Sequence, residues 1–174
     1  VLVQWLDEES PETREEVIQA YLEDITFFRR LGFDLLNQYQ ESCSDLLRRE
    51  LFDEDNYTAV WTQTDFLKLL QESFESLSDS EQERITDIIL SVPPRESLEE
   101  RADERSERVD DVTAAELRER YVDQWVRERL WLIRDQLPDR GASRLAELQE
   151  QYEGEPRDLV SDSQVKSGFV SEES

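Results

Sequence analysis

Apolar residues recur at helical spacing through most of this chain, in segments bounded by capping residues and prolines. The clearest segment is LSDSEQERITDIILSVPP, residues 77–94. Ser78 is a preferred N-cap residue, and Glu81 stands three residues later, as in a capping box. Because Pro93 and Pro94 prevent continuation, the pattern predicts an amphipathic helix that ends before them. Its apolar face consists of Ile85, Ile88, Ile89 and Val92.

The same combination of signals predicts several further helices. Ser10 followed by Pro11 starts one of them, and Thr113 with Glu116 forms a second capping box at the start of the longest. Gly32, inside a helical segment, indicates a close approach between two helices. The predicted apolar faces lie at residues 17–25, 27–39, 46–52, 66–77, 117–133 and 142–152.

The segment DEDNYTAVWTQT, residues 53–64, interrupts this pattern and is predicted to be a polar turn with an aromatic insert. Thr62 with Asp65 resembles the cap of the helix that follows. The acidic run begins like a calcium-binding loop, but Thr58 and Thr64 stand where that loop has Gly and Glu. We therefore predict no metal site here.

These segments predict an all-α chain of about seven helices joined by short turns, with no credible strand pair. The expected architecture is an irregular helical-repeat array of the α-solenoid type or a multi-helix bundle, because no strict repeat period is visible. We expect an N-terminal helical module at 1–92, a charged linker or exposed helix at 93–112, a C-terminal helical hairpin at 113–153 and a non-helical tail at 154–174.

The chain carries 44 acidic and 20 basic residues, for a net charge of −24, and only Lys68 and Lys166 are lysines. This balance favours a halophilic, archaeal protein, because molar salt shortens the Debye length to about 3 Å and screens self-repulsion. An ordinary acidic protein from a GC-rich genome, in which arginine codons displace lysine, is the alternative. In either case we expect no nucleic-acid partner, since binding to phosphates requires clustered Lys and Arg.

Catalytic chemistry finds little support in the residue types. The chain has no histidine, which removes the most frequent general base and metal ligand, and its four glycines form no nucleotide-binding loop. Cys43 has no histidine to activate it, so we expect it to be a half-buried small residue without a catalytic role. A single cysteine also favours a reducing, cytoplasmic location for the protein. No apolar run is long enough to span a membrane. We predict a non-enzymatic protein without a cofactor; a hydrolase with a carboxylate-bound metal is the enzymatic alternative.

Three tryptophans, Trp61, Trp125 and Trp131, are the candidate partner-binding residues. Large aromatic side chains pack in protein cores, and at interfaces they supply binding hot spots. Both interpretations stay open for these three positions. Arginines alternate with aromatic residues over 118–134, but acidic neighbours can pair with them along the helix, which disfavours a nucleic-acid site.

Three stretches resemble a known family: FFRRLGFDLLNQY at 27–39, TDFLKLLQESFESLSDSEQERITDIIL at 64–90, and RERLWLIRDQLPDRGASRLAELQEQYEGEPRDL at 127–159, followed by SGFVSEES. They are similar to stretches in the long helical-repeat regions of large prokaryotic ATP-binding proteins that look like defence proteins of the STAND NTPase type. The resemblance covers about residues 28–174, and Val92-Pro93 stands where the family has Gly-Pro. It implies a scaffold or sensor segment of a larger, haloarchaeal protein, whose ATP-binding residues lie in another domain.

Together these observations predict a non-enzymatic helical-repeat scaffold or sensor module that contacts a protein partner or neighbouring domains of the same chain. The alternative is a small stand-alone acidic adaptor, antitoxin or nucleic-acid mimic, whose charge would sequester a basic partner. Binding by such a mimic weakens steeply with added KCl, whereas binding through an apolar interface does not.

The charge balance generates a first prediction, about salt. If the protein is halophilic, its helical circular-dichroism signal is lost in about 0.1 M KCl and regained in molar KCl, where charge repulsion is screened. Cooperative unfolding from a fully helical state at low salt would contradict the halophilic interpretation.

Overall fold

The fold is taken from a computed structural model, which describes residues 2–23, 26–106, 113–157 and 159–160. Within these ranges the chain is all-α and contains no strand, which confirms the predicted fold class. Nine α-helices are present there instead of about seven, because the first segment and the highly charged segment also form helices. The elements are α1 (Leu2–Glu8), α2 (Pro11–Glu23), α3 (Thr26–Gln38), α4 (Ser44–Leu51), η1 (Glu54–Tyr57), α5 (Gln63–Ser73), η2 (Phe74–Ser76), α6 (Asp79–Ser91), α7 (Arg95–Ser106), α8 (Ala114–Leu132), η3 (Arg134–Gln136) and α9 (Asp139–Gln151).

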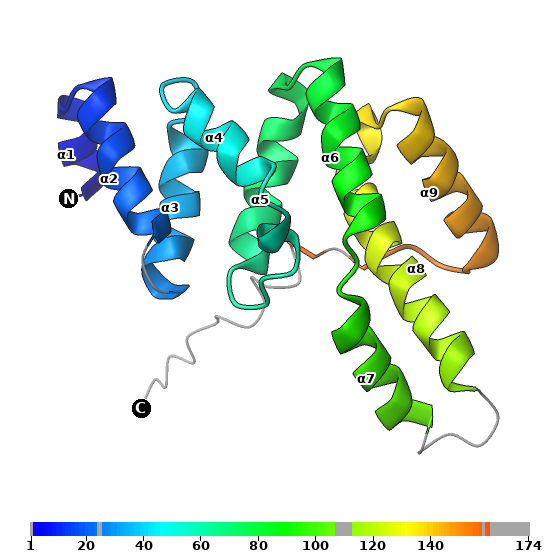
Figure 1. The fold of residues 1–174 in the computed structure, drawn as a ribbon. Helices are drawn as coiled ribbons and strands as arrows, with labels where there is room; N and C mark the ends of the chain where they lie inside the picture. Colours follow the sequence, from blue (N-terminus) through cyan, green and yellow to red (C-terminus); the bar gives the residue numbers. More distant parts are fainter. Residues whose placement is uncertain (1, 24–25, 107–112, 158, 161–174) are drawn as a thin grey trace, which may run out of the picture.

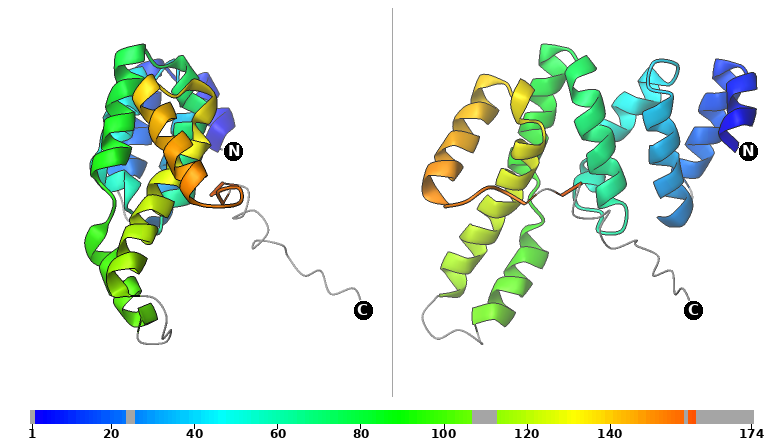
Figure 2. Two further views of the ribbon diagram at one scale, coloured as in Figure 1. Left: turned by 90° about the vertical axis from the view of Figure 1, so that its right-hand side faces the viewer. Right: turned by 180° about the vertical axis from the view of Figure 1, so that it is seen from behind.

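The helices lie in a row, from α1 and α2 at one end to α9 at the other (Figure 1). Figure 2 shows the same row from one end and from behind. Helix α2 packs on α3, α3 packs on α5, and α8 is contacted by α6, α7 and α9. Because each helix contacts mainly its neighbours, the arrangement is close to one-dimensional, as in repeat proteins. A single cluster of buried apolar side chains extends from Leu6 in α1 to Leu148 in α9.

The close approach expected at Gly32 is found between α2 and α3. A Cβ atom built on Gly32 would lie 2.9 Å from Leu22 Cδ2, closer than such atoms come in real structures. Leu22 is itself buried in the core. A side chain larger than hydrogen at position 32 would therefore push the two helices apart.

The two strongest predicted capping boxes are confirmed. The Glu81 carboxylate accepts hydrogen bonds from the Ser78 backbone N–H (2.9 Å) and the Ser78 hydroxyl (2.7 Å), and Arg48 Nε of α4 donates to it at 2.5 Å. The two Ser78 hydrogen bonds and the Arg48 contact lower the pKa of Glu81 to about 2. At the start of α8, Glu116 accepts from the Thr113 N–H at 2.9 Å, and the Glu116 N–H donates to Thr113 Oγ1 at 3.3 Å.

The cap predicted from Thr62 and Asp65 is wrong. Thr62 does precede α5, but its hydroxyl is buried without a hydrogen-bond partner. Its backbone is not in the extended conformation that lets an N-cap side chain reach the following N–H groups (φ −111°, ψ 0°). Asp65 is engaged elsewhere, because it accepts a 2.6 Å hydrogen bond from Arg30 Nε of α3.

The highly charged segment predicted at 93–112 is a helix over residues 95–106, namely α7. Its few apolar residues Leu98 and Ala102 are buried, and the helix packs along α8. An ion pair of 2.6 Å between Asp103 and Arg118 joins the same two helices. Residues 107–112 and most of the predicted tail at 154–174 lie outside the described residues; those described after α9 are not helical.

A second prediction concerns the α6 cap and pH. Because the pKa of folded Glu81 lies below its usual value near 4.5, its charged form stabilises the fold above that value. This stabilisation is lost as the pH falls toward about 2. We expect Glu81→Gln to reduce the free energy of unfolding by about 1 kcal/mol at pH 7, with a smaller effect in acid. Urea titrations at both pH values measure this difference.

The matched control is Glu116→Gln, which changes the same capping motif in α8 without removing an arginine contact. We expect a smaller loss there at neutral pH, because the pKa of Glu116 is lowered by Thr113 hydrogen bonds alone. A constant difference between wild type and Glu81→Gln across the pH range would show that the carboxylate charge does not stabilise the cap.

Candidate protein-interaction surface

Large apolar side chains are exposed at a few places in the described part of the chain. Trp5 is 43% exposed and Phe28 39%, whereas Val60 and Trp61 reach 77% and 79%. Val60 and Trp61 are adjacent and belong to the turn between η1 and α5, seen as the loop that precedes α5 in Figure 1. We call residues 58–62 the Trp61 turn. Single exposed apolar residues are normal on protein surfaces, but a tryptophan this exposed beside an equally exposed valine is an interaction-site candidate.

The other two candidate tryptophans face different surroundings. Trp125 is 7% exposed and packs in the core, with the guanidinium of Arg129 lying 3.7 Å from its ring centroid. Trp131 is half-buried, and the guanidinium of Arg134 covers its ring at 4.4 Å. Of the three candidates, only Trp61 presents its ring to solvent. Helical periodicity could not predict these differences in exposure. It assigns Trp125 and Trp131 to one broad face, and it does not apply to Trp61, which lies in a turn.

The sequence reasoning missed three exposed apolar residues, Trp5, Phe28 and Val60. The predicted apolar face at 27–39 includes Phe28, which the structure leaves 39% exposed near the start of α3. Trp5 lies in α1, a seven-residue helix too short to show a clear apolar face. Val60 lies next to Trp61 in a segment where no periodicity applies. The only sequence signal for Val60 is the placement of two large apolar residues inside a predicted polar turn.

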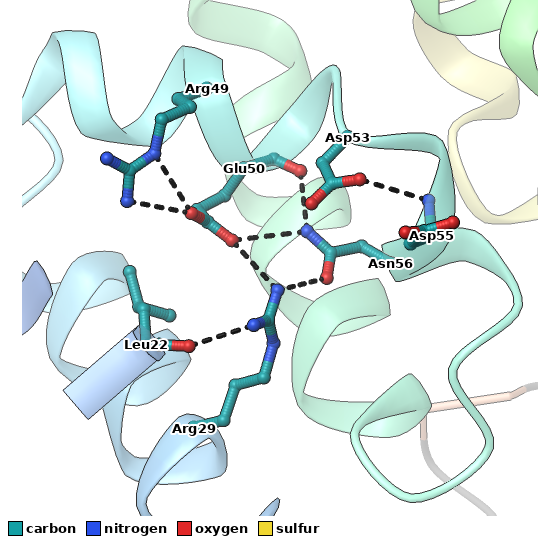
Figure 3. A network of polar contacts seen from close by, with 7 residues as sticks. All are labelled: Leu22, Arg29, Arg49, Glu50, Asp53, Asp55 and Asn56. Carbon is teal, nitrogen blue, oxygen red and sulfur yellow. Dashed lines mark hydrogen bonds and ion pairs between the residues drawn. The ribbon is translucent and has the colours of Figure 1, made fainter. Parts of the chain in front are cut away.

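The Trp61 turn follows a buried polar network that joins α2, α3, α4 and η1 (Figure 3). Asn56 is at its centre and is 1% exposed. Its Nδ2 donates to the Glu50 carbonyl at 2.9 Å, and its Oδ1 accepts from Arg29 Nη2 at 2.8 Å. Arg29 also donates to the Leu22 carbonyl at 2.8 Å and contacts the Glu50 carboxylate at 3.3 Å. The network therefore holds the base of the turn against three helices.

Tyr57, the residue after Asn56, is fixed by contacts with α4, α5 and α8. Its ring is fully buried and meets the Phe66 ring edge-on, with 4.9 Å between centroids. Its hydroxyl donates to the Leu51 carbonyl at 2.8 Å, and burial raises the pKa of Tyr57 well above its usual value. Arg129 Nη2 of α8 donates to the Tyr57 carbonyl at 3.3 Å. Burial lowers the pKa of Arg129 to about 9.

Backbone hydrogen bonds also fix the residues on both sides of the exposed pair, Val60 and Trp61. The N–H groups of Thr58 and Ala59 donate to the Asp55 carbonyl at 3.2 and 3.1 Å, and the Phe66 N–H donates to the Thr62 carbonyl at 3.0 Å. Val60 and Trp61 thus project from a turn whose two ends are fixed. A side chain presented in this way loses little conformational freedom when a partner binds, which favours affinity.

Cys43 and the acidic side chains were the remaining candidates for chemistry. Burial raises the pKa of the Cys43 thiol, which lies 3.8 Å from the Ser42 hydroxyl, so its thiolate form is disfavoured. No group of three His, Cys, Asp or Glu side chains in the described residues could hold a metal ion. The described helices include none that is both long and apolar enough to cross a lipid bilayer.

A cavity of about 510 Å³ lies between α6 and the start of α9 and is rimmed by carboxylates. Asp87 there is paired with Arg140 at 2.5 Å. The Thr86 hydroxyl in its wall donates to the Gln82 carbonyl at 2.9 Å. That hydrogen bond engages the hydroxyl proton with the backbone of α6, and the chain has no histidine to remove it.

Comparison with known proteins adds no relative: no family model, no curated protein sequence and no solved structure matches this chain. The resemblance to the helical-repeat regions of STAND-type ATP-binding proteins therefore stays a prediction from the sequence motifs.

A third prediction tests the network beneath the Trp61 turn. Asn56→Ala leaves the Glu50 carbonyl and one Arg29 nitrogen without this buried partner, so we expect a loss of about 2 kcal/mol in the free energy of unfolding. Asn37→Ala is the control, because Asn37 of α3 hydrogen-bonds only to surface side chains, Glu72 and Gln40. Its expected effect is within about 0.5 kcal/mol. Equal losses for the two variants in urea titrations would contradict the role given to Asn56.

Proposed function

We propose that this chain is a non-enzymatic helical-repeat scaffold or sensor module that binds a protein partner, or a neighbouring domain of the same chain, through the Trp61 turn. One observation carries the proposal: Trp61 is 79% exposed on a turn whose flanking residues are held by buried hydrogen bonds. Tryptophan is among the residues most enriched in interface hot spots. The row of helices supplies the rigid support that such a site needs.

The energetics favour a tryptophan that is covered in the complex. Leaving a large aromatic side chain in water forgoes about 2–3 kcal/mol relative to burying it. Because Trp61 is exposed in the free protein, its burial in an apolar pocket of a partner would contribute this free energy to association. Trp61 is thus the proposed anchor, and the residues around it provide the surrounding contact surface.

A second candidate function is the acidic adaptor, antitoxin or nucleic-acid mimic, and the net charge of −24 is the observation that favours it. Such a protein binds a basic partner through distributed charge, so its affinity does not depend on one aromatic side chain. Salt separates the two functions: molar KCl abolishes binding by distributed charge and largely preserves binding through a buried tryptophan.

A fourth prediction follows from the role of Trp61. We expect Trp61→Ala in the natural, full-length protein to reduce co-purification of its main partner from the source cells at least thirtyfold, roughly the effect of losing a hot-spot residue. The stability should change by no more than about 0.5 kcal/mol, because the side chain is exposed. Quantitative mass spectrometry of the purified complexes measures the first effect, and urea titration the second.

Trp5→Ala is the matched control, since Trp5 is a second exposed tryptophan and lies in α1, away from the Trp61 turn in the sequence. It should leave the co-purified proteins unchanged. Retention of the same partners by Trp61→Ala, with only Trp5→Ala reducing them, would move the interaction surface to α1 and refute the proposal.

A further inference from the structure

The segment that contains the Trp61 turn has no positive charge of its own. No Lys or Arg occurs from residue 50 to residue 67. Asp53, Glu54 and Asp55 directly precede the turn, and Glu54 and Asp55 are exposed. No ion pair involves these three carboxylates in the part of the chain that the structure describes.

Some acidic residues elsewhere have a basic partner in a neighbouring helix. Interhelical ion pairs of 2.5 to 2.7 Å in the described residues are Arg30–Asp65, Arg48–Glu81, Arg118–Asp103, Arg140–Asp87 and Arg144–Asp123, and longer ones are Arg29–Glu50 at 3.3 Å and Lys68–Asp34 at 4.0 Å. Within the described ranges, the carboxylates at 53–55 share the lack of an ion-pair partner with many other acidic residues, and their distinguishing feature is that they directly precede the exposed pair Val60 and Trp61. They are available to a cation supplied from outside.

The acidic run and the apolar pair form one projection. The Asp55 carbonyl accepts hydrogen bonds from the Thr58 and Ala59 N–H groups, so η1 leads directly into the turn. Asp53 caps η1, because its carboxylate accepts from the Asp55 N–H at 3.1 Å. A partner that covers Trp61 would therefore approach the segment that carries these carboxylates.

We infer that the Trp61 turn, residues 58–62, together with the carboxylates at 53–55, docks on a basic protein surface whose apolar pocket receives Trp61 and whose rim carries Arg or Lys. The inference rests on the proposed function and adds the chemistry of the partner. A hydrophobic centre with a charged, polar rim is the usual anatomy of such interfaces. Rim charges of opposite sign would set the orientation and raise the association rate.

Other kinds of partner fit this surface less well. A second copy of this chain would bring another net charge of −24 against the same acidic run, and the two would repel each other. Nucleic acid and anionic membranes carry negative charge as well. A protein surface that combines an apolar pocket with guanidinium or ammonium groups is the complementary partner.

The test uses a random peptide library displayed on phage, selected on the whole 174-residue chain. Synthetic copies of the selected peptides are then titrated by fluorescence anisotropy. The test variants are Trp61→Ala and the triple variant Asp53→Asn, Glu54→Gln, Asp55→Asn. Asn at position 53 keeps the cap of η1, because Asn and Asp are equally good N-cap residues. Circular dichroism verifies that each variant is folded.

The charge control is the triple variant Glu96→Gln, Glu99→Gln, Glu100→Gln. It makes the same change in net charge on the exposed surface of α7, a helix whose main contacts are with α8 (Figure 1). A comparison of the two triple variants therefore separates local contact with the acidic run from the effect of overall charge.

We expect the selected peptides to combine a large apolar cluster with Arg or Lys. The titrations start at the lowest KCl concentration at which circular dichroism shows the wild-type chain folded. There Trp61→Ala should weaken peptide binding at least thirtyfold and the 53–55 variant about tenfold, and the factor for the 53–55 variant should fall as KCl is raised further. The α7 variant should weaken peptide binding less than about twofold, since its charges do not touch the peptide.

Three outcomes would overturn the inference. If Trp61→Ala abolishes binding and the 53–55 variant does not alter it, the proposed function stands and the basic partner is refuted. If the 53–55 and α7 variants weaken binding equally, overall charge is responsible. If the peptides bind Trp61→Ala as well as wild type, or if no peptide is selected, the proposed function falls too.

Discussion

The buried carboxylate of Glu50 is the constraint around which the first half of the fold is organised. It lies at the end of α4 and is contacted by Arg29 at 3.3 Å, by Arg49 at 3.2 Å and by Asn56 Nδ2 at 3.2 Å. A buried charge is tolerated only when its partners satisfy it, and removal of the charged partner from a buried ion pair typically costs about 3–5 kcal/mol. Helices α3 and α4 and η1, which supply these partners, are therefore held in one arrangement (Figure 3).

Arg129 of α8 is a second buried charge that links distant elements, but different groups compensate for its burial. Among the described residues it is the largest fully buried side chain, yet it is stabilised by the Trp125 ring and two carbonyl oxygens, and its Nε has no hydrogen-bond partner among them. Burying a cation in this way is unfavourable, and the lowered pKa of Arg129 reflects that cost. What the residue provides is a link between α8 and the carbonyl of Tyr57. The turn that carries Trp61 is thus fixed by helices from both halves of the row.

Six arginines form ion pairs between helices in the described part of the chain. With 20 basic residues against 44 acidic ones, the chain as a whole carries excess negative charge. Interhelical pairs such as Arg30–Asp65 and Arg144–Asp123 place a cation of one helix against a carboxylate of its neighbour. Each exposed pair contributes little by itself, about 0–1 kcal/mol, but together they offset repulsion along the row. Asp53, Glu54 and Asp55 have no such pair among the described residues, and the chemistry proposed for the partner follows from their place beside the exposed Trp61 turn.

The sequence by itself determined the helical class, most helix boundaries, the capping boxes at Ser78 and Thr113, and the close approach at Gly32. These features depend on residues within one helical turn or on the absence of a side chain, so local rules suffice. Local rules failed for the cap at Thr62, because Asp65 accepts a hydrogen bond from Arg30, which lies 35 residues away in the sequence. Only the tertiary structure decided that Trp125 is buried, that Trp131 is covered and that Trp61 is exposed. Exposure depends on which distant side chains pack around a residue, and a pattern along the chain does not contain that information.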